Sequence, residues 1–155
     1  MPKRSLFAAL LFSTMLVDAS AHDQHAAAPG GPGDAANVTR TVEISMKETA
    51  DGKMLFEPAS LSATSGETLR FVLRNDGEGD HEFILGDAAT LAEHGQMMQE
   101  FPDMHHNDGG SVRLAPGQSG EIVWTFGTAT EMEFACLIPG HYEAGMHGKV
   151  SITAR

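Results

Sequence analysis

Apolar and polar residues alternate along most of the chain, the pattern of strands that bury one face. In residues 38–46, for example, Val42, Ile44 and Met46 share a face. Runs of this kind are separated by turn signals such as Pro116-Gly117. The strands predicted in this way are residues 38–46, 54–56, 61–63, 67–74, 81–86, 112–114, 121–126, 131–136 and 149–153.

We expect about seven to eight of these nine runs to form separate strands of an all-β fold, a Greek-key β-sandwich with turns between its strands. The region 87–110 breaks the pattern, and residues 88–99 lack helix breakers apart from Gly95, so we expect a short helical or irregular insertion there. Residues 38–155 are enough for one core and are predicted to form a single domain.

The first residues have the pattern of an export signal. A basic start precedes the apolar run Leu6–Val17, and Ala19-Ser-Ala21 supplies small residues for cleavage. That run is shorter than the about 20 apolar residues of a membrane-spanning helix. Residues 1–21 are therefore predicted to be a signal peptide cleaved after Ala21 or Ala19, which implies a periplasmic protein without membrane insertion after cleavage.

Residues 22–37 are rich in His, Gly and Pro and lack apolar periodicity, which predicts a flexible tether. The formal net charge of the whole chain is −11, and removal of residues 1–21 would leave 8 basic and 20 acidic residues, a net charge of −12. This charge disfavours nucleic acid and anionic lipid as partners. It fits a basic redox partner, or it serves solubility alone.

The candidate chemistry is concentrated near the C-terminus. Cys136 is the only cysteine, and His141 and Met146 follow it at intervals of five on a segment that Pro139 and Gly140 keep from being helical. In an oxidising compartment a single thiol is exposed to oxidation unless something protects it. Metal ligation gives such protection, and burial as an inert small hydrophobe is the alternative.

A second imidazole, His81, heads the strand predicted at residues 81–86. One Cys, two His and a weak Met form the ligand set of a type 1 copper site, in which the Met is axial. The plain alternatives are a solvated His81 and a Met146 that only fills the core. A zinc site is disfavoured because a thioether is a poor zinc ligand.

At these residues the chain resembles the cupredoxins, the family of azurin, plastocyanin and auracyanin. The resemblance rests on the C-x4-H-x4-M loop, the upstream His81-Glu-Phe and the closing strand Gly148-Lys-Val-Ser-Ile152. It implies one type 1 copper centre with His81, Cys136 and His141 in the plane and Met146 as axial ligand. It also implies that His141 lies near the surface as the electron exit. The loop looks most like that of the periplasmic copper-resistance cupredoxins of the CopI type.

Two residues depart from the pattern of the family. Glu82 stands where many electron-transfer cupredoxins carry Asn, and Asp80 stands where azurins carry Gly. The resemblance thus leads us to expect a different, charged bond at Glu82 and a site that is tetragonally distorted, green rather than blue.

Further soft and borderline copper ligands lie outside this loop. An insertion cluster and the tether supply them, and each is either an auxiliary copper site or a feature without a metal role. The insertion cluster comprises His94, Met97, Met98, Met104, His105 and His106, and the tether contributes His22 and His25.

Two functions remain open at this point, and the sequence suggests no catalytic constellation for an enzyme. The first is periplasmic copper handling and tolerance with a redox-active Cu(I)/Cu(II) centre, which the insertion cluster and the resemblance favour. The second is one-electron transfer between redox partners, which the closed ligand set favours. We expect copper ions as the main partner, a redox partner protein in the second case, and a monomer.

Overall fold

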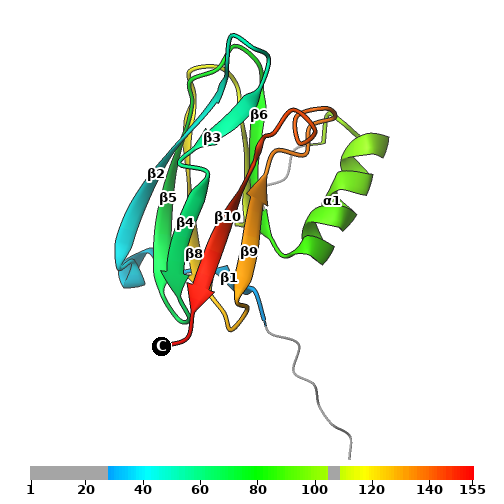
Figure 1. Cartoon of the computed structure of the whole chain (residues 1–155). Coiled ribbons are helices and arrows are strands. Elements are labelled where there is room, and N and C mark those ends of the chain that lie inside the picture. Colours follow the sequence, from blue (N-terminus) through cyan, green and yellow to red (C-terminus); the bar gives the residue numbers. More distant parts are fainter. Residues whose placement is uncertain (1–27, 105–108) are drawn as a thin grey trace, which may run out of the picture.

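The computed structural model describes residues 28–104 and 109–155. They form two packed β-sheets with one α-helix at the side (Figure 1). The strands are β1 Gly30–Pro32, β2 Arg40–Glu48, β3 Met54–Glu57, β4 Ser60–Thr64, β5 Thr68–Asn75, β6 His81–Gly86, β7 Ser111–Leu114, β8 Ser119–Phe126, β9 Glu131–Ala135 and β10 His147–Thr153. The helices are the short 3-10 turn η1 Ala35–Asn37 and the α-helix α1 Ala88–Glu100. The predicted all-β sandwich is confirmed.

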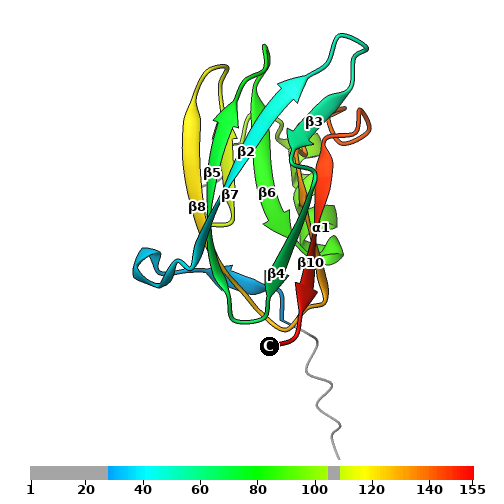
Figure 2. The same cartoon turned by 60° about the vertical axis from the view of Figure 1, so that its left-hand side comes forward.

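One sheet has the strand order β1-β8-β5-β2-β3, and the other has the order β4-β10-β9-β6-β7. Figure 2 shows the two sheets edge on, with β2 and β5 in one layer and β4 and β10 in the other. Most neighbours are antiparallel, while β2 pairs with β5 and β4 pairs with β10 in parallel. The turn between β2 and β3 and the loop before β10 lie at the same end of the sandwich, as Figure 1 shows.

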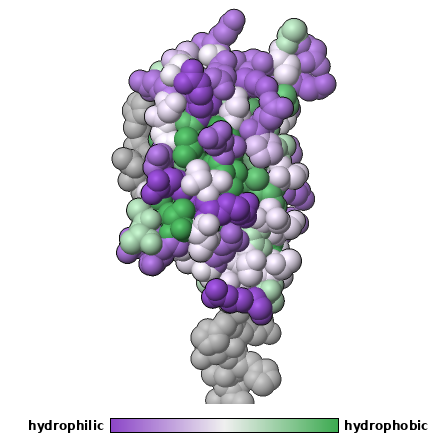
Figure 3. All heavy atoms as spheres, turned by 90° about the vertical axis from the view of Figure 1, so that its left-hand side faces the viewer, coloured by the Kyte–Doolittle hydropathy of each residue, from purple (hydrophilic) through white to green (hydrophobic). Residues whose placement is uncertain are grey.

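Alternating side chains fill the space between the sheets, as the sequence pattern predicts. Val42, Ile44 and Met46 of β2 are all buried, and so are Leu69 and its alternating neighbours on β5. Burial of such a side chain is worth about 1.5–3 kcal/mol, so this core supplies the main stabilisation. On the face shown in Figure 3 hydrophilic residues form most of the surface, with hydrophobic ones appearing between them.

The prediction of a tether over residues 22–37 is wrong for its second part. Gly30–Pro32 pairs antiparallel with β8, and η1 follows it. Glycine permits this close pairing, because a Cβ on Gly33 would lie 2.7 Å from Thr125 Oγ1. Backbone pairing of this kind leaves no apolar period in the sequence. Residues 22–27 and the predicted signal peptide lie outside the described residues.

The insertion forms a single helix, α1, where the sequence left helix or irregular structure open. Asp87 caps its N-terminus by accepting a hydrogen bond of 2.8 Å from the Thr90 N–H. Leu91, His94 and Met98 form its buried side, and α1 packs beside β6 and β9 (Figure 1). No helix in residues 28–104 and 109–155 is long and apolar enough to span a membrane.

Candidate metal centre

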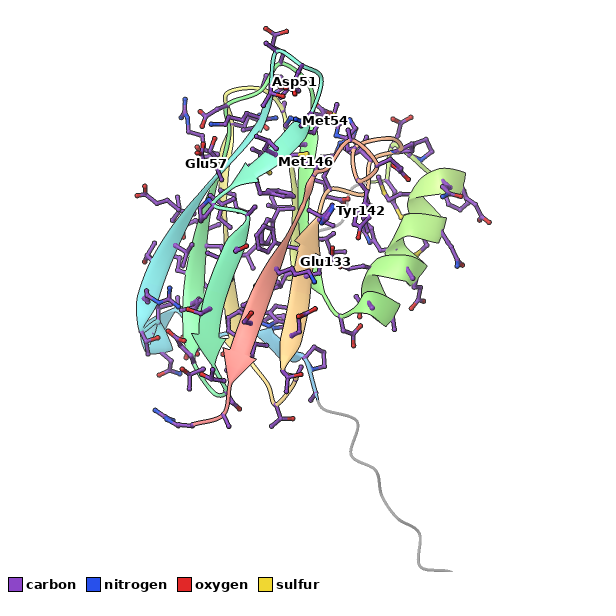
Figure 4. The ribbon with its side chains drawn as sticks, viewed as in Figure 1. Asp51, Met54, Glu57, Glu133, Tyr142 and Met146 are labelled. Atoms are coloured by element: carbon purple, nitrogen blue, oxygen red, sulfur yellow. The ribbon has the colours of Figure 1, made fainter. Side chains whose placement is uncertain are left out.

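Two strand ends and one loop bring the candidate ligands together. His81 is the first residue of β6, and Cys136 directly follows β9, which pairs antiparallel with β6. The antiparallel register places the start of one strand beside the end of the other. His141 lies on the loop that follows, and Met146 is the last residue before β10 (Figure 4).

The ligand atoms of His81, Cys136 and His141 lie within 4.8 Å of one another. The His141 Nδ1 atom is 3.3 Å from Cys136 Sγ and 3.3 Å from His81 Nδ1. Two atoms that each lie about 2.0–2.3 Å from one metal ion are about 3–4 Å apart. The three donors therefore fit a single metal ion, and a thiolate with two imidazoles is the donor set that copper prefers.

Backbone hydrogen bonds fold the loop back on itself. The Cys136 N–H donates to the Met146 carbonyl at 3.0 Å, and the Met146 N–H donates to the His141 carbonyl at 3.0 Å. Gly140 and Gly145 adopt φ of 90° and 102°, which residues with a side chain avoid. Met146 is thereby brought beside Cys136, and its side chain is fully buried.

Burial sets the protonation of the donors. It raises the pKa of Cys136 to about 12, so the thiol is neutral until a metal displaces its proton. Burial also lowers the pKa of His81 and of His141, which keeps both imidazoles neutral and their ring nitrogens able to bind a metal. His81 is fully buried, whereas His141 is partly exposed, as expected of a residue near the surface.

Aromatic side chains close the site on its inner side. Phe83 and Phe134 stack with ring centroids 5.3 Å apart, and Phe56 meets both edge-on. These rings are buried and exclude water from this side of the site. Leu137 and Ile138 are only partly buried and face the groove between the loop and α1.

Glu82, the first departure from the family pattern, has a partner that the sequence did not reveal. Its backbone N–H lies 3.3 Å from Cys136 Sγ and donates to it. Its carboxylate is buried, and Oε1 lies 3.2 Å from His94 Nε2 on α1. The predicted charged interaction at this position is thus an interaction with the helix. Asp80, the second departure, pairs with Arg113 at 3.2 Å.

The structure separates the residues of the insertion cluster. His94 and Met98 are buried on the inner side of α1, whereas Met97 is 37% exposed on the outer side. Met97 and Met98 therefore do not act as a pair toward one ion, and Met104 lies beyond the end of the helix. His105, His106, His22 and His25 lie outside the described residues, so a metal role for them stays a prediction.

Sequence reasoning also missed Glu48 and the group around Tyr142. The Glu48 carboxylate lies 3.0 Å from His81 Nε2. Tyr142 stacks on His147 with centroids 4.6 Å apart and donates a hydrogen bond of 2.9 Å to Glu133 (Figure 4). Glu48 ends a strand that is distant in the sequence from His81, and no spacing rule connects the two.

Comparison with known proteins agrees with this geometry. The sequence model of the family described as copper binding proteins, plastocyanin/azurin family, matches residues 42–153. The chain belongs to this family. The match includes all four candidate ligands. It begins two residues into β2, so it omits β1 and η1, and it extends to the end of β10.

Two curated relatives and one solved structure are similar to this cupredoxin. It is 53% identical over 135 residues to the copper-resistant cuproprotein CopI of Rubrivivax gelatinosus, covering 86% of this chain and 79% of that protein. It is 38% identical to the copper-resistant cuproprotein CopI of Pseudomonas aeruginosa, and the match covers 97% of this chain and 98% of that protein. The structure of auracyanin B is similar with a TM-score of 0.63 and 24% identity, over 83% of this chain and 99% of that one. The last similarity concerns the fold alone.

Proposed function

We propose that this cupredoxin binds one copper ion through His81, Cys136, His141 and Met146, and that it acts in periplasmic copper handling and tolerance. The single observation that carries the metal site is the meeting of three donor atoms within 4.8 Å on rigid strand ends and a folded loop. The role is supported by the 53% identity to a protein named for copper resistance. Copper bound here supplies one-electron Cu(I)/Cu(II) chemistry.

Each residue of the site has its own role in binding the metal. Cys136 would give up its proton on binding copper and become a thiolate, and the N–H of Glu82 donates to its sulfur. The buried His81 and the loop residue His141 would hold the metal with it, and the buried rings of Phe56, Phe83 and Phe134 exclude water on the inner side of the site. A preformed site of this kind changes little when the metal changes oxidation state. We infer a copper-binding role without catalysis, in line with the family described as copper binding proteins.

One-electron transfer is the second candidate function, and one observation favours it. Gly140 and Tyr142, on both sides of His141, line a groove of about 300 Å³ between the ligand loop and α1. A partner protein that docks there would lie close to a metal ligand that is itself partly exposed. A net charge of −11 would favour a basic partner.

The metal site is tested by copper titration of the exported protein, followed by visible absorption and metal analysis. We expect an intense thiolate-to-copper band that Cys136→Ser removes. His147→Gln is the matched control, since this partly exposed histidine lies next to Met146 and outside the proposed ligand set. A wild type without the band, or a Cys136→Ser variant that keeps it, would refute the site.

The two roles are separated in cells. A deletion strain that is sensitive to copper and is rescued by the wild type but not by Cys136→Ser supports copper tolerance. A strain with normal copper tolerance and impaired respiration supports electron transfer instead. Metal analysis also separates the two roles, because more than one copper ion per chain favours copper handling over electron transfer. Intact-mass measurement of the exported protein tests the predicted cleavage after Ala21 or Ala19.

A further inference from the structure

Glu48 is the last residue of β2, and its carboxylate reaches the buried imidazole of His81. Its Oε1 atom lies 3.0 Å from His81 Nε2, whose side chain is fully buried. The same carboxylate accepts the backbone N–H groups of Glu78 at 2.9 Å and Gly79 at 3.0 Å. It therefore joins β2, the loop before β6 and the ring of a proposed metal ligand.

The orientation of the His81 ring determines which of its two nitrogens faces Glu48. Nδ1 faces His141 Nδ1 at 3.3 Å, so Nε2 points away from the donor cluster and toward Glu48. A neutral imidazole carries one N–H and one lone pair, and an ionised carboxylate only accepts hydrogen bonds. A carboxylate beside Nε2 thus favours the tautomer with its proton on Nε2 and its lone pair on Nδ1, aimed at the donor cluster.

Of the acidic side chains near His81, Glu48 is the one that contacts Nε2. Within the described residues this nitrogen makes no hydrogen bond of good geometry, and the Glu48 carboxylate at 3.0 Å is the acidic group paired with it. The carboxylates that flank His81 in the sequence are engaged elsewhere, Asp80 with Arg113 and Glu82 with His94.

Gly77 provides the space in which the carboxylate and the imidazole meet. A Cβ at this position would lie 2.3 Å from Glu48 Oε2 and 2.8 Å from His81 Nε2. Any side chain here would push the two groups apart. The loop is held in place by Asn75, which donates to the Gly79 carbonyl at 2.8 Å and accepts the Gly77 N–H at 2.9 Å.

We propose that Glu48 is a positioning residue for the copper ligand His81, fixing its tautomer and ring orientation through Nε2 and placing a negative charge behind the ligand. This inference rests on the proposed copper site. Partners of this kind on metal-binding histidines typically change metal affinity by about 10- to 100-fold when removed. The added negative charge favours Cu(II) over Cu(I), so its removal raises the reduction potential.

The test compares Glu48→Ala and Glu48→Gln with Glu43→Gln. Glu43 is exposed on the same strand about 16 Å away, and its change alters the net charge equally. For Glu48→Ala we expect about 10- to 100-fold weaker Cu(II) binding and a higher potential than in the control. Glu48→Gln keeps an oxygen that accepts the ring N–H, so it should restore part of the affinity while its potential stays raised.

A second readout needs no copper. In the metal-free protein, NMR of isotope-labelled histidine reports which ring nitrogen of His81 carries the proton. We expect the Nε2–H tautomer in the wild type and in Glu43→Gln, and a mixture in Glu48→Ala. Gly77→Ala keeps the carboxylate but intrudes between the two groups, so it should also give a mixture. It provides the test if Glu48→Ala fails to fold.

The proposal is overturned if the His81 tautomer, the Cu(II) affinity and the potential of Glu48→Ala equal those of Glu43→Gln. Glu48 would then only fasten the loop to β2. A failure of the proposed function looks different, since the wild type would then show no copper band that depends on Cys136. The tautomer measurement in the metal-free protein still decides the role of Glu48 in that case.

Discussion

The buried pair of Glu82 and His94 makes a sharp prediction about stability. Their side chains are only 2% and 5% exposed, and Glu82 Oε1 lies 3.2 Å from His94 Nε2. The other carboxylate oxygen, Oε2, has no hydrogen-bond partner among the described residues. His94 is therefore the side chain that compensates a buried acid, and it also fastens α1 to the strand that begins with His81.

Replacement of His94 by leucine removes this compensation without opening a large cavity. Leucine is of similar size, and Leu91 already lies on the same buried side of α1. Loss of one partner of a buried pair costs about 3–5 kcal/mol, because the remaining group is left buried alone. With a urea dependence of about 1–3 kcal/mol per M, the unfolding midpoint should fall by at least about 1 M.

The assay is urea unfolding of the metal-free protein, followed by circular dichroism. The matched control is Lys149→Ala, which breaks the exposed contact of 3.4 Å with Glu131 between neighbouring strands and should cost less than about 1 kcal/mol. The double variant Glu82→Leu/His94→Leu should regain most of the loss, since it removes both buried polar groups. The reasoning is refuted if His94→Leu costs no more than Lys149→Ala, or if the double variant is less stable than the single one.

Three further predictions concern glycine positions and the thiol. Gly148→Ala should destabilise the fold by several kcal/mol in the same unfolding assay, since its Cβ would lie 2.2 Å from the Phe134 ring and 2.6 Å from the Ala59 carbonyl; an unchanged midpoint would contradict this. Gly95→Ala on α1 meets nothing within 4 Å and should stabilise by about 0.5–1 kcal/mol; a loss of stability would show that the site is crowded. Because burial raises the pKa of Cys136 to about 12, the unfolded thiol ionises first as the pH rises. The metal-free wild type should lose about 1.4 kcal/mol per pH unit, relative to Cys136→Ala, between about pH 9 and pH 12. Parallel pH curves for the two proteins would exclude this contribution.

The sequence predicts those parts of the molecule that depend on local pattern. Strand faces follow from alternation, as with Val42 and Ile44, which are both buried. The ligand loop is also local, because Cys136, His141 and Met146 are evenly spaced and glycines allow the chain to turn back. His81 is distant in the sequence from this loop, and the ligand set of a type 1 copper site together with the resemblance to the family connected the two, not a local pattern.

Contacts between distant segments could not be predicted in the same way. The sequence suggested that His94 belongs to a soft cluster of metal ligands, yet packing of α1 buries it against Glu82. The strand β1 was hidden for a related reason, since three residues of Gly and Pro pair with β8 through their backbone. In both cases the deciding partner lies in an element that no periodicity connects to the residue.

Three carboxylates surround His81, and their partners determine how much charge each directs at the proposed metal site. Asp80 is paired with Arg113, and Glu82 is paired with His94. Glu48 alone among them turns its carboxylate to the His81 ring. If Glu48 acts as we propose, the oxidised metal is the better stabilised form, since negative charge beside a ligand favours the higher positive charge. A site biased in this way retains Cu(II) firmly, which suits copper handling better than rapid exchange of electrons with a partner.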